Sequence, residues 1–141
     1  PQYMAPEQAL GHELDGRADL YSLGCVAFYL LTGRPVFEAD TPMRVMIAHV
    51  SSAPPDLRTL IADWIPPELE TVLASCLAKS PDDRPASARA LGALLRAIPV
   101  PQNKAWTEDR AQDWWQLHYP RRRTIRPATD PRQLHIIDTR P

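Results

Sequence analysis

Apolar side chains occupy every side of one segment of the chain, residues 19–31, which reads DLYSLGCVAFYLL. Only Asp19 and Ser22 in this segment are clearly polar. A helix that is apolar all round belongs either at the centre of a core or inside a membrane. A membrane span needs about 20 residues, and the thirteen residues here are too few. The pattern therefore predicts a helix at the centre of a protein core.

The next segment, residues 42–50, has the pattern of an amphipathic helix. Thr41 is suited to cap it, and Pro42 to fill its first position. Its apolar residues recur at positions i, i+3, i+4 and i+7 of one face: Met43, Met46, Ile47 and Val50. Because such faces usually pack inward, we expect this stripe to be buried. The polar side, with Arg44 and His49, is then the better candidate for contacts with partners.

Three further helices are indicated between proline-rich connections. They are expected over residues 67–79, 86–98 and 107–119. The first carries acidic residues in its first turn and a lysine at its end, which suits the helix dipole. No segment of the first hundred residues shows the alternation of a strand. The sequence therefore predicts a mainly α fold.

The chain changes character after residue 98. Residues 99–120 are interpreted as a linker and a helix rich in tryptophan, and residues 121–141 as an Arg/Pro-rich flexible tail. In this last helix, four residues share one face at positions i, i+3, i+4 and i+7: Ala111, Trp114, Trp115 and His118. We expect this face to dock on the preceding helices rather than to form a ligand site.

Charge is distributed unevenly along the chain, but its balance does not indicate a nucleic-acid-binding protein. Residues 1–100 hold 8 Lys/Arg and 12 Asp/Glu, whereas residues 101–141 hold 8 and 5. An Arg-rich tail that bound nucleic acid would show strongly salt-dependent affinity, but the acidic balance of residues 1–100 argues against this function. Cys25 and Cys76 lie in apolar helical patterns without metal or redox spacing. They favour buried thiols in a reducing, cytoplasmic compartment.

Three strings occur in an informative order: YMAPEQ, then DGRADLYSLGCVAFYLLTGRPVF, then CLAKSPDDRPASARAL. Together they resemble the C-terminal lobe of bacterial, eukaryotic-like serine/threonine protein kinases, from the end of the activation segment onward. The resemblance covers residues 1–98. It implies a helical partial C-lobe in which Pro1, Tyr3 and Met4 line the shallow apolar site for the substrate residue that follows the phosphorylated Ser or Thr. From spacing alone, the same residues also fit a simple proline turn entering a helix at Glu7.

The resemblance also implies a structural ion pair between Glu7 and Arg84. A planar guanidinium donates two parallel hydrogen bonds to a carboxylate, so the pair would tie the substrate loop to the last helices. The alternative is two separate surface charges that contribute almost nothing to stability. Asp19 is expected to cap the central helix, and the family adds a second role, as an anchor for the catalytic loop.

The groups that carry phosphoryl transfer are absent from this sequence. It contains no G-x-G-x-x-G, no H-R-D and no D-F-G, and all of these precede APE in the family's order. We therefore expect a fragment with no catalytic and no metal-binding residues, which binds neither ATP nor Mg²⁺, although the parent kinase uses both. Its expected partners are protein substrates and the missing N-terminal part of the kinase domain, with no nucleic acid and no membrane contact. The alternative is a pseudokinase or helical binding module, and a membrane anchor elsewhere in the parent stays open.

Overall fold

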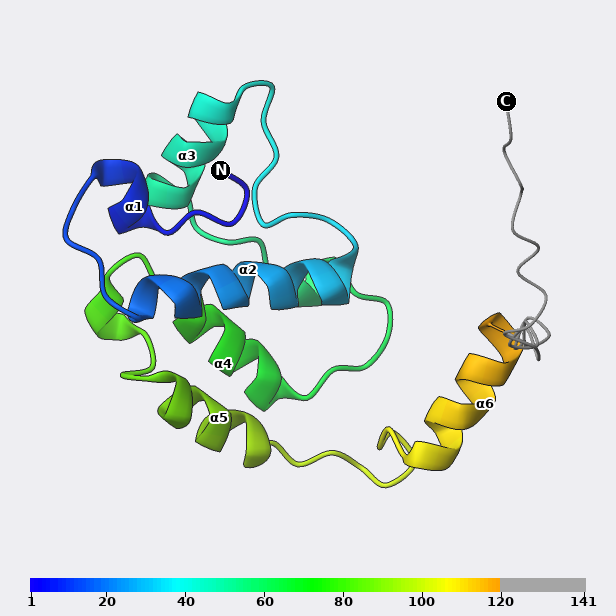
Figure 1. The fold of residues 1–141 in the computed structure, drawn as a ribbon. Coiled ribbons are helices and arrows are strands. Elements are labelled where there is room, and N and C mark those ends of the chain that lie inside the picture. The colour runs from blue at the N-terminus through cyan, green and yellow to red at the C-terminus, as the bar shows by residue number, and fades with distance from the viewer. Residues whose placement is uncertain (120–141) are drawn as a thin grey trace, which may run out of the picture. The chain divides into compact units, whose positions relative to one another are not determined.

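The computed structural model describes residues 1–119, which are helical and contain no β-strand (Figure 1). This confirms the mainly α prediction. The helices are α1 (Pro6–Leu10), α2 (Arg17–Thr32), α3 (Pro42–Ser51), η1 (Leu57–Thr59), α4 (Pro67–Cys76), η2 (Pro81–Asp83), α5 (Ala88–Arg96) and α6 (Glu108–His118). The chain forms one compact unit over Pro1–Val100, and a second begins at Pro101. The predicted flexible tail, residues 121–141, lies outside the described residues.

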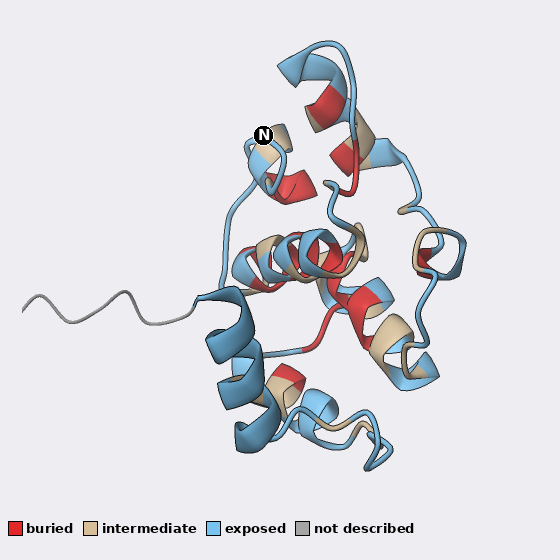
Figure 2. Cartoon of the chain, turned by 90° about the vertical axis from the view of Figure 1, so that its right-hand side faces the viewer, coloured by how far each residue is buried: buried red, intermediate tan, exposed pale blue. Residues whose placement is uncertain are grey.

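Helix α2 is the central element, as its all-round apolar pattern predicts. It buries Tyr21, Cys25 and Phe28 almost completely, and buried residues gather around it and α4 (Figure 2). It ends at Gly33, whose φ of 73° is the left-handed conformation that glycine adopts without strain. Two clusters of buried residues, one with Tyr21, Cys25 and Phe28 and one with Leu20, therefore pack against this single helix.

The predicted role of Asp19 as the cap of α2 is wrong. The helix begins two residues earlier, with Gly16 at the N-cap position, and Asp19 lies exposed in the first turn. The reason is that Asp15 provides the capping acceptor, because its carboxylate accepts a hydrogen bond from the Arg17 N–H at 2.8 Å. A side-chain oxygen two residues upstream thus starts the helix before Asp19 is reached. Asp19 retains a favourable position for the helix dipole.

Helices α2 and α4 approach each other closely at Gly24. A Cβ atom on Gly24 would lie 2.9 Å from the Cβ of Cys76 and 3.2 Å from Cδ2 of Leu77. Both cysteines are free and buried, and burial raises the pKa of the Cys25 thiol to about 12. The thiols therefore act as small core side chains at this helix crossing.

The prediction for α3 has the wrong face buried. Met43 and Ile47 are 61% and 55% exposed, whereas Val45 and His49 are buried. The reason is a tertiary contact: the His49 ring meets the Tyr21 hydroxyl at 2.9 Å, inside the core. Helix α3 also packs against α1. A polar residue with a good partner therefore outweighs the more continuous apolar stripe.

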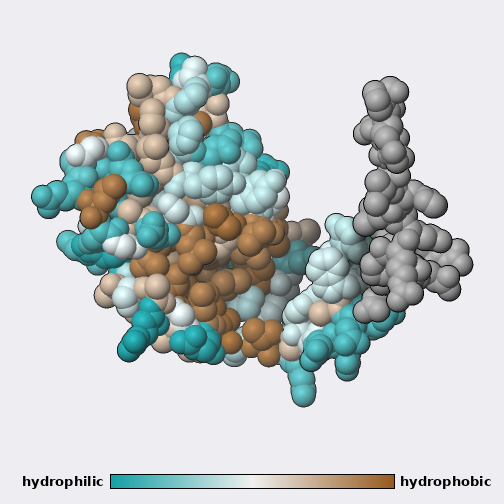
Figure 3. Space-filling view, viewed as in Figure 1, coloured by the Kyte–Doolittle hydropathy of each residue, from teal (hydrophilic) through white to brown (hydrophobic). Residues whose placement is uncertain are grey.

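One face of α2 is apolar and uncovered. Leu23, Val26 and Leu30 are 49%, 40% and 77% exposed, and Figure 3 shows hydrophobic side chains gathered over α2 and toward α5. In α5, Leu91 is buried while Leu94 and Leu95 are 45% and 41% exposed. Within residues 1–119, no helix is long and apolar enough to cross a membrane.

Helix α6 belongs to the second unit. Thr107 caps it by accepting a hydrogen bond from the Arg110 N–H at 3.3 Å. The Trp114 ring stacks on His118 with centroids 4.4 Å apart, and it meets Trp115 edge to face. The helix and its aromatic face form as the sequence indicates, and the docking of this face stays a prediction.

Candidate functional site

Arg84 and Glu7 form a buried ion pair. The guanidinium donates to both carboxylate oxygens of Glu7, at 2.6 Å from Nη1 and 2.8 Å from Nη2. Its other hydrogens go to the backbone carbonyls of Ala78, Arg17 and Lys79, at 2.9, 3.0 and 3.0 Å. All five guanidinium N–H groups therefore have acceptors.

The surroundings of this pair explain why it is well suited to hold its position. The side chain of Arg84 is fully shielded and that of Glu7 is 7% exposed. The Cζ atom of Arg84 lies 4.9 Å from the centroid of the Tyr21 ring, which supports the guanidinium from one side. The hydrogen bond from Arg84 holds the pKa of Glu7 below its usual value, so the carboxylate stays charged near neutral pH. The pair joins α1 to the turn that follows η2.

The pair fixes one end of residues 1–4, which we call the 1–4 segment. The hydroxyl of Ser22 in α2 donates a hydrogen bond to the Tyr3 carbonyl at 2.8 Å, and this bond holds the segment at Tyr3. Pro1 and Tyr3 line a shallow cavity of about 310 Å³ together with residues 39–42 and Val45 of α3. Met4 is half-buried and does not line this cavity. The structure thus brings two of the three predicted substrate-site residues to one hollow.

A polar cluster beneath this hollow was missed by the sequence reasoning. The Lys79 amine donates to the His49 carbonyl at 2.8 Å and lies 4.7 Å from the centroid of the Phe37 ring. Burial lowers the pKa of Lys79 to about 8, and burial with the nearby Lys79 charge lowers the pKa of His49 to about 4. A second helical face, Val45, Ala48 and His49, was the available signal. This face was not recognised because a hydrophobicity pattern counts histidine as polar.

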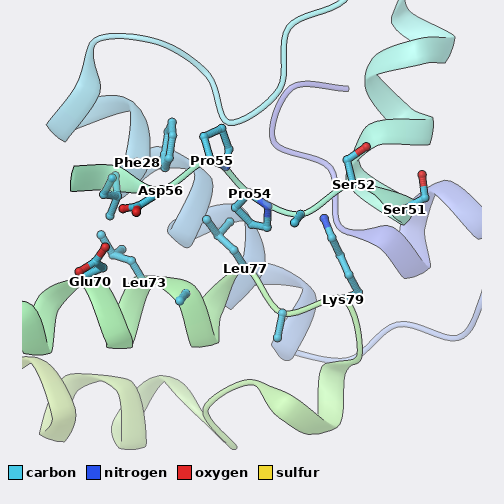
Figure 4. A pocket seen from close by; sticks show the side chains of 14 residues that line it. Phe28, Ser51, Ser52, Pro54, Pro55, Asp56, Glu70, Leu73, Leu77 and Lys79 are labelled. Carbon is cyan, nitrogen blue, oxygen red and sulfur yellow. The ribbon is translucent and has the colours of Figure 1, made fainter. Parts of the chain in front are cut away.

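A larger cavity of about 500 Å³ lies between α2, residues 51–57 and α4. Figure 4 shows Lys79 at the end near Ser51 and Ser52, and Asp56 with Glu70 at the opposite end. Glu70 accepts a hydrogen bond from Arg58 at 2.6 Å, and Asp56 accepts one from the Arg58 backbone N–H at 2.8 Å. The charged groups at both ends therefore already have partners within the chain. No unpaired charge in this cavity indicates a ligand.

Residues 1–119 contain no cluster of three or more His, Cys, Asp or Glu side chains placed to hold a metal ion. The features that the described residues do provide are the shallow hollow lined by Pro1 and Tyr3 and the buried Glu7–Arg84 ion pair.

A profile of the protein kinase domain matches residues 1–94. The chain belongs to the protein kinase family. The segment is 43% identical over 91 residues to serine/threonine-protein kinase PksC of Streptomyces coelicolor, covering 64% of this chain and 16% of that protein. It is 47% identical over 105 residues to serine/threonine-protein kinase PknF of Mycobacterium tuberculosis, covering 72% of this chain and 22% of that protein.

The kinase segment is also similar to serine/threonine-protein kinase PknB of Mycolicibacterium smegmatis, with 47% identity over 83 residues. That match covers 59% of this chain and 13% of the relative. The kinase segment therefore spans roughly a fifth or less of the length of these bacterial kinases. The similarity identifies a transferase family that uses ATP and Mg²⁺ and acts on proteins.

Proposed function

We propose that this chain is the substrate-loop and scaffold part of a serine/threonine protein kinase. In the complete protein, the kinase domain transfers the γ-phosphate of ATP to Ser or Thr of protein substrates. The 1–4 segment receives the substrate residue after the phosphorylated one, with Pro1, Tyr3 and Met4 as its contacts. The phosphate-binding and catalytic groups belong to other residues of the complete kinase.

The observation that carries this proposal is the Glu7–Arg84 pair with its five hydrogen bonds. A surface ion pair is worth little, but this pair is shielded and joins residues 77 positions apart. It therefore holds the 1–4 segment against α2 in one position. A peptide-binding hollow needs this preorganisation, since ordering a loop at the moment of binding lowers affinity.

The uncovered apolar face of α2 supports a second part of the proposal. Isolated exposed apolar residues are normal, but a continuous stripe on the central helix marks an interface. Leu23, Val26 and Leu30 form such a stripe. We assign it to the N-terminal part of the kinase domain, which would cover α2 and complete the core.

Phosphate transfer by the complete protein tests the proposal. The complete protein should transfer ³²P from ATP to myelin basic protein, and residues 1–141 alone should neither bind ATP nor transfer phosphate. Transfer by the purified chain alone would contradict the assignment of its role. A complete protein that binds partner proteins but transfers no phosphate would favour the alternative, a pseudokinase or helical binding module.

A further inference from the structure

His49 is a fully buried histidine with one unpaired nitrogen. It is 0% exposed, and its Nδ1 lies 2.9 Å from the Tyr21 hydroxyl. Its Nε2 is buried and has no hydrogen-bond partner among the described residues. Leaving a buried polar atom unpaired costs about 1–3 kcal/mol. Such an atom in a packed core therefore needs a reason to be there.

The neighbours of His49 select one arrangement of its protons. Lys79 is a donor without acceptor capacity, and its amine lies 2.8 Å from the His49 carbonyl and 3.4 Å from the Tyr21 hydroxyl oxygen. With its oxygen facing the lysine, Tyr21 is free to donate its own proton to Nδ1 of His49. The neutral imidazole then carries its proton on Nε2. The unpaired atom is therefore an N–H donor.

The 1–4 segment offers a backbone acceptor beside α3. Gln2 lines the shallow hollow between Pro1 and Tyr3, and its backbone works against the lowering of the His49 pKa. Val45, one turn earlier in α3, lines the same hollow as Pro1 and Tyr3. The buried side of α3 thus lies directly behind the backbone of the proposed substrate loop.

We propose that His49 is a positioning residue for protein substrate: its Nε2–H, oriented by Tyr21, closes onto the Gln2 carbonyl when a substrate occupies the 1–4 segment. This inference rests on the proposed kinase function. Catalytic hydrogen bonds are often long in the free protein and shorten in the complex, and the proposal extends this behaviour to the positioning bond of His49. His49 touches neither ATP nor the transferred phosphate, so its effect falls on the affinity for protein substrate.

Two substitutions in the complete kinase separate positioning from simple core packing. Glutamine keeps an N–H donor near the place of Nε2, whereas asparagine is too short to reach it and keeps only a group near Nδ1. We expect His49→Asn to raise the KM for myelin basic protein roughly three- to tenfold, the worth of one lost hydrogen bond, with the KM for ATP unchanged. His49→Gln should restore most of this loss. His12→Asn, at an exposed histidine, is the matched control and should change neither KM.

Equal KM values for protein substrate in His49→Asn and the unmodified kinase would overturn the inference. So would a parallel loss in both His49 variants that follows their melting temperatures, because that result indicates packing alone. A readout without catalysis covers the case in which the complete protein transfers no phosphate. In ¹⁵N-labelled complete protein, the ring must show a protonated Nε2. With myelin basic protein added, the Tyr3 and Met4 amides must exchange faster in His49→Asn than in His49→Gln. A protonated Nδ1 or equal exchange would refute the role of His49 independently of the kinase function.

Discussion

Arg84 shows how one side chain can organise a site that it does not enter. Its guanidinium joins α1, the start of α2 and the turn after α4 through five hydrogen bonds. The geometry needs a planar fork, because parallel bonds to Glu7 leave the other three hydrogens pointing at carbonyls. Lysine offers three donors from one nitrogen and cannot reproduce this pattern.

Removal of either partner of the Glu7–Arg84 pair should strand a buried charge. We expect Glu7→Ala and Arg84→Ala each to cost about 3–5 kcal/mol in the free energy of unfolding of the complete kinase domain. The double variant should cost much less than the sum, and Arg84→Lys should recover only part of the loss. Urea denaturation measures all four variants. Additive single effects would show that the two residues are not coupled.

Acid should weaken the fold through His49. The pKa of His49 is about 4 in the folded chain against 6.5 ordinarily. Burial and the positive charges of Lys79 and of the chain's N-terminal amine disfavour the imidazolium, whereas the Gln2 backbone favours it and the Tyr21 hydroxyl is uncharged. Between these values the unfolded chain binds a proton that the folded chain does not. The free energy of unfolding therefore falls as pH falls from about 6.5 to 4, by about 3 kcal/mol in total.

His49→Gln should lose this part of the acid sensitivity. The comparison is urea denaturation of the complete kinase domain and its His49→Gln variant at pH 7 and pH 4.5, in which the carboxylates common to both proteins cancel. We expect the unmodified domain to lose about 2–3 kcal/mol more than the variant. Equal losses would mean that His49 is protonated in the folded state.

At the scale of elements, apolar periodicity was enough for helices but not for their buried faces. The all-round apolar pattern of residues 19–31 placed α2 at the centre, and the structure agrees. For α3 the stripe through Met43 and Ile47 was the more regular pattern, yet the helix buries His49. Periodicity counts apolar residues and does not see a distant hydroxyl such as that of Tyr21. The choice of face is therefore a tertiary property.

The same limit applies to the ends of elements and to the candidate site. The cap of α2 depends on Asp15 reaching the Arg17 N–H, and the sequence alone offers both Asp15 and Asp19 as capping residues. The kinase resemblance suggested Glu7 and Arg84 as partners. The other acceptors of Arg84 are backbone carbonyls, which no residue type reveals. The roles of Pro1, Tyr3 and Met4 stay predictions.

The crossing of α2 and α4 should not tolerate a side chain at position 24. Gly24→Ala places a Cβ 2.9 Å from the Cβ of Cys76, so we expect a loss of about 1–3 kcal/mol in the complete kinase domain. Gly92→Ala is the matched control within α5, where the new Cβ meets only the flexible Arg96 guanidinium at 3.4 Å. That change should be neutral or stabilising by about 0.5–1 kcal/mol. Thermal unfolding measures both, and an equal response at the two positions would contradict the close crossing.

At the scale of the molecule, residues 1–100 have a core on one side of α2 and an open apolar face on the other. The buried cluster joins Tyr21, Phe28, Leu57 and Leu73, whereas Leu23 and Leu30 face outward. An apolar face of this length does not lower the stability of the domain when another part of the domain covers it. Left uncovered, it weakens packing and promotes association.

Residues 1–141 in isolation should therefore bind the dye ANS and unfold over a broad temperature range. In the isolated chain, Leu23→Gln with Leu30→Gln should lower ANS fluorescence, because the stripe becomes polar. In the complete kinase domain the same pair should instead lower the melting temperature, because there the stripe is buried. Leu14→Gln, at an exposed leucine in the loop before α2, should do neither. A sharp transition of an isolated monomer without ANS binding would contradict an uncovered face.

The Glu7–Arg84 pair can form only some seconds after Glu7 has been synthesised. The two residues are 77 positions apart, and ribosomes add about 5–20 residues each second. Glu7 therefore leaves the site of peptide-bond formation roughly 4–15 s before Arg84 exists. In that interval α1 lacks its ion pair, and α5 has not been made. The step that secures the proposed substrate loop therefore waits until the turn after η2 has left the ribosome, well after the loop itself.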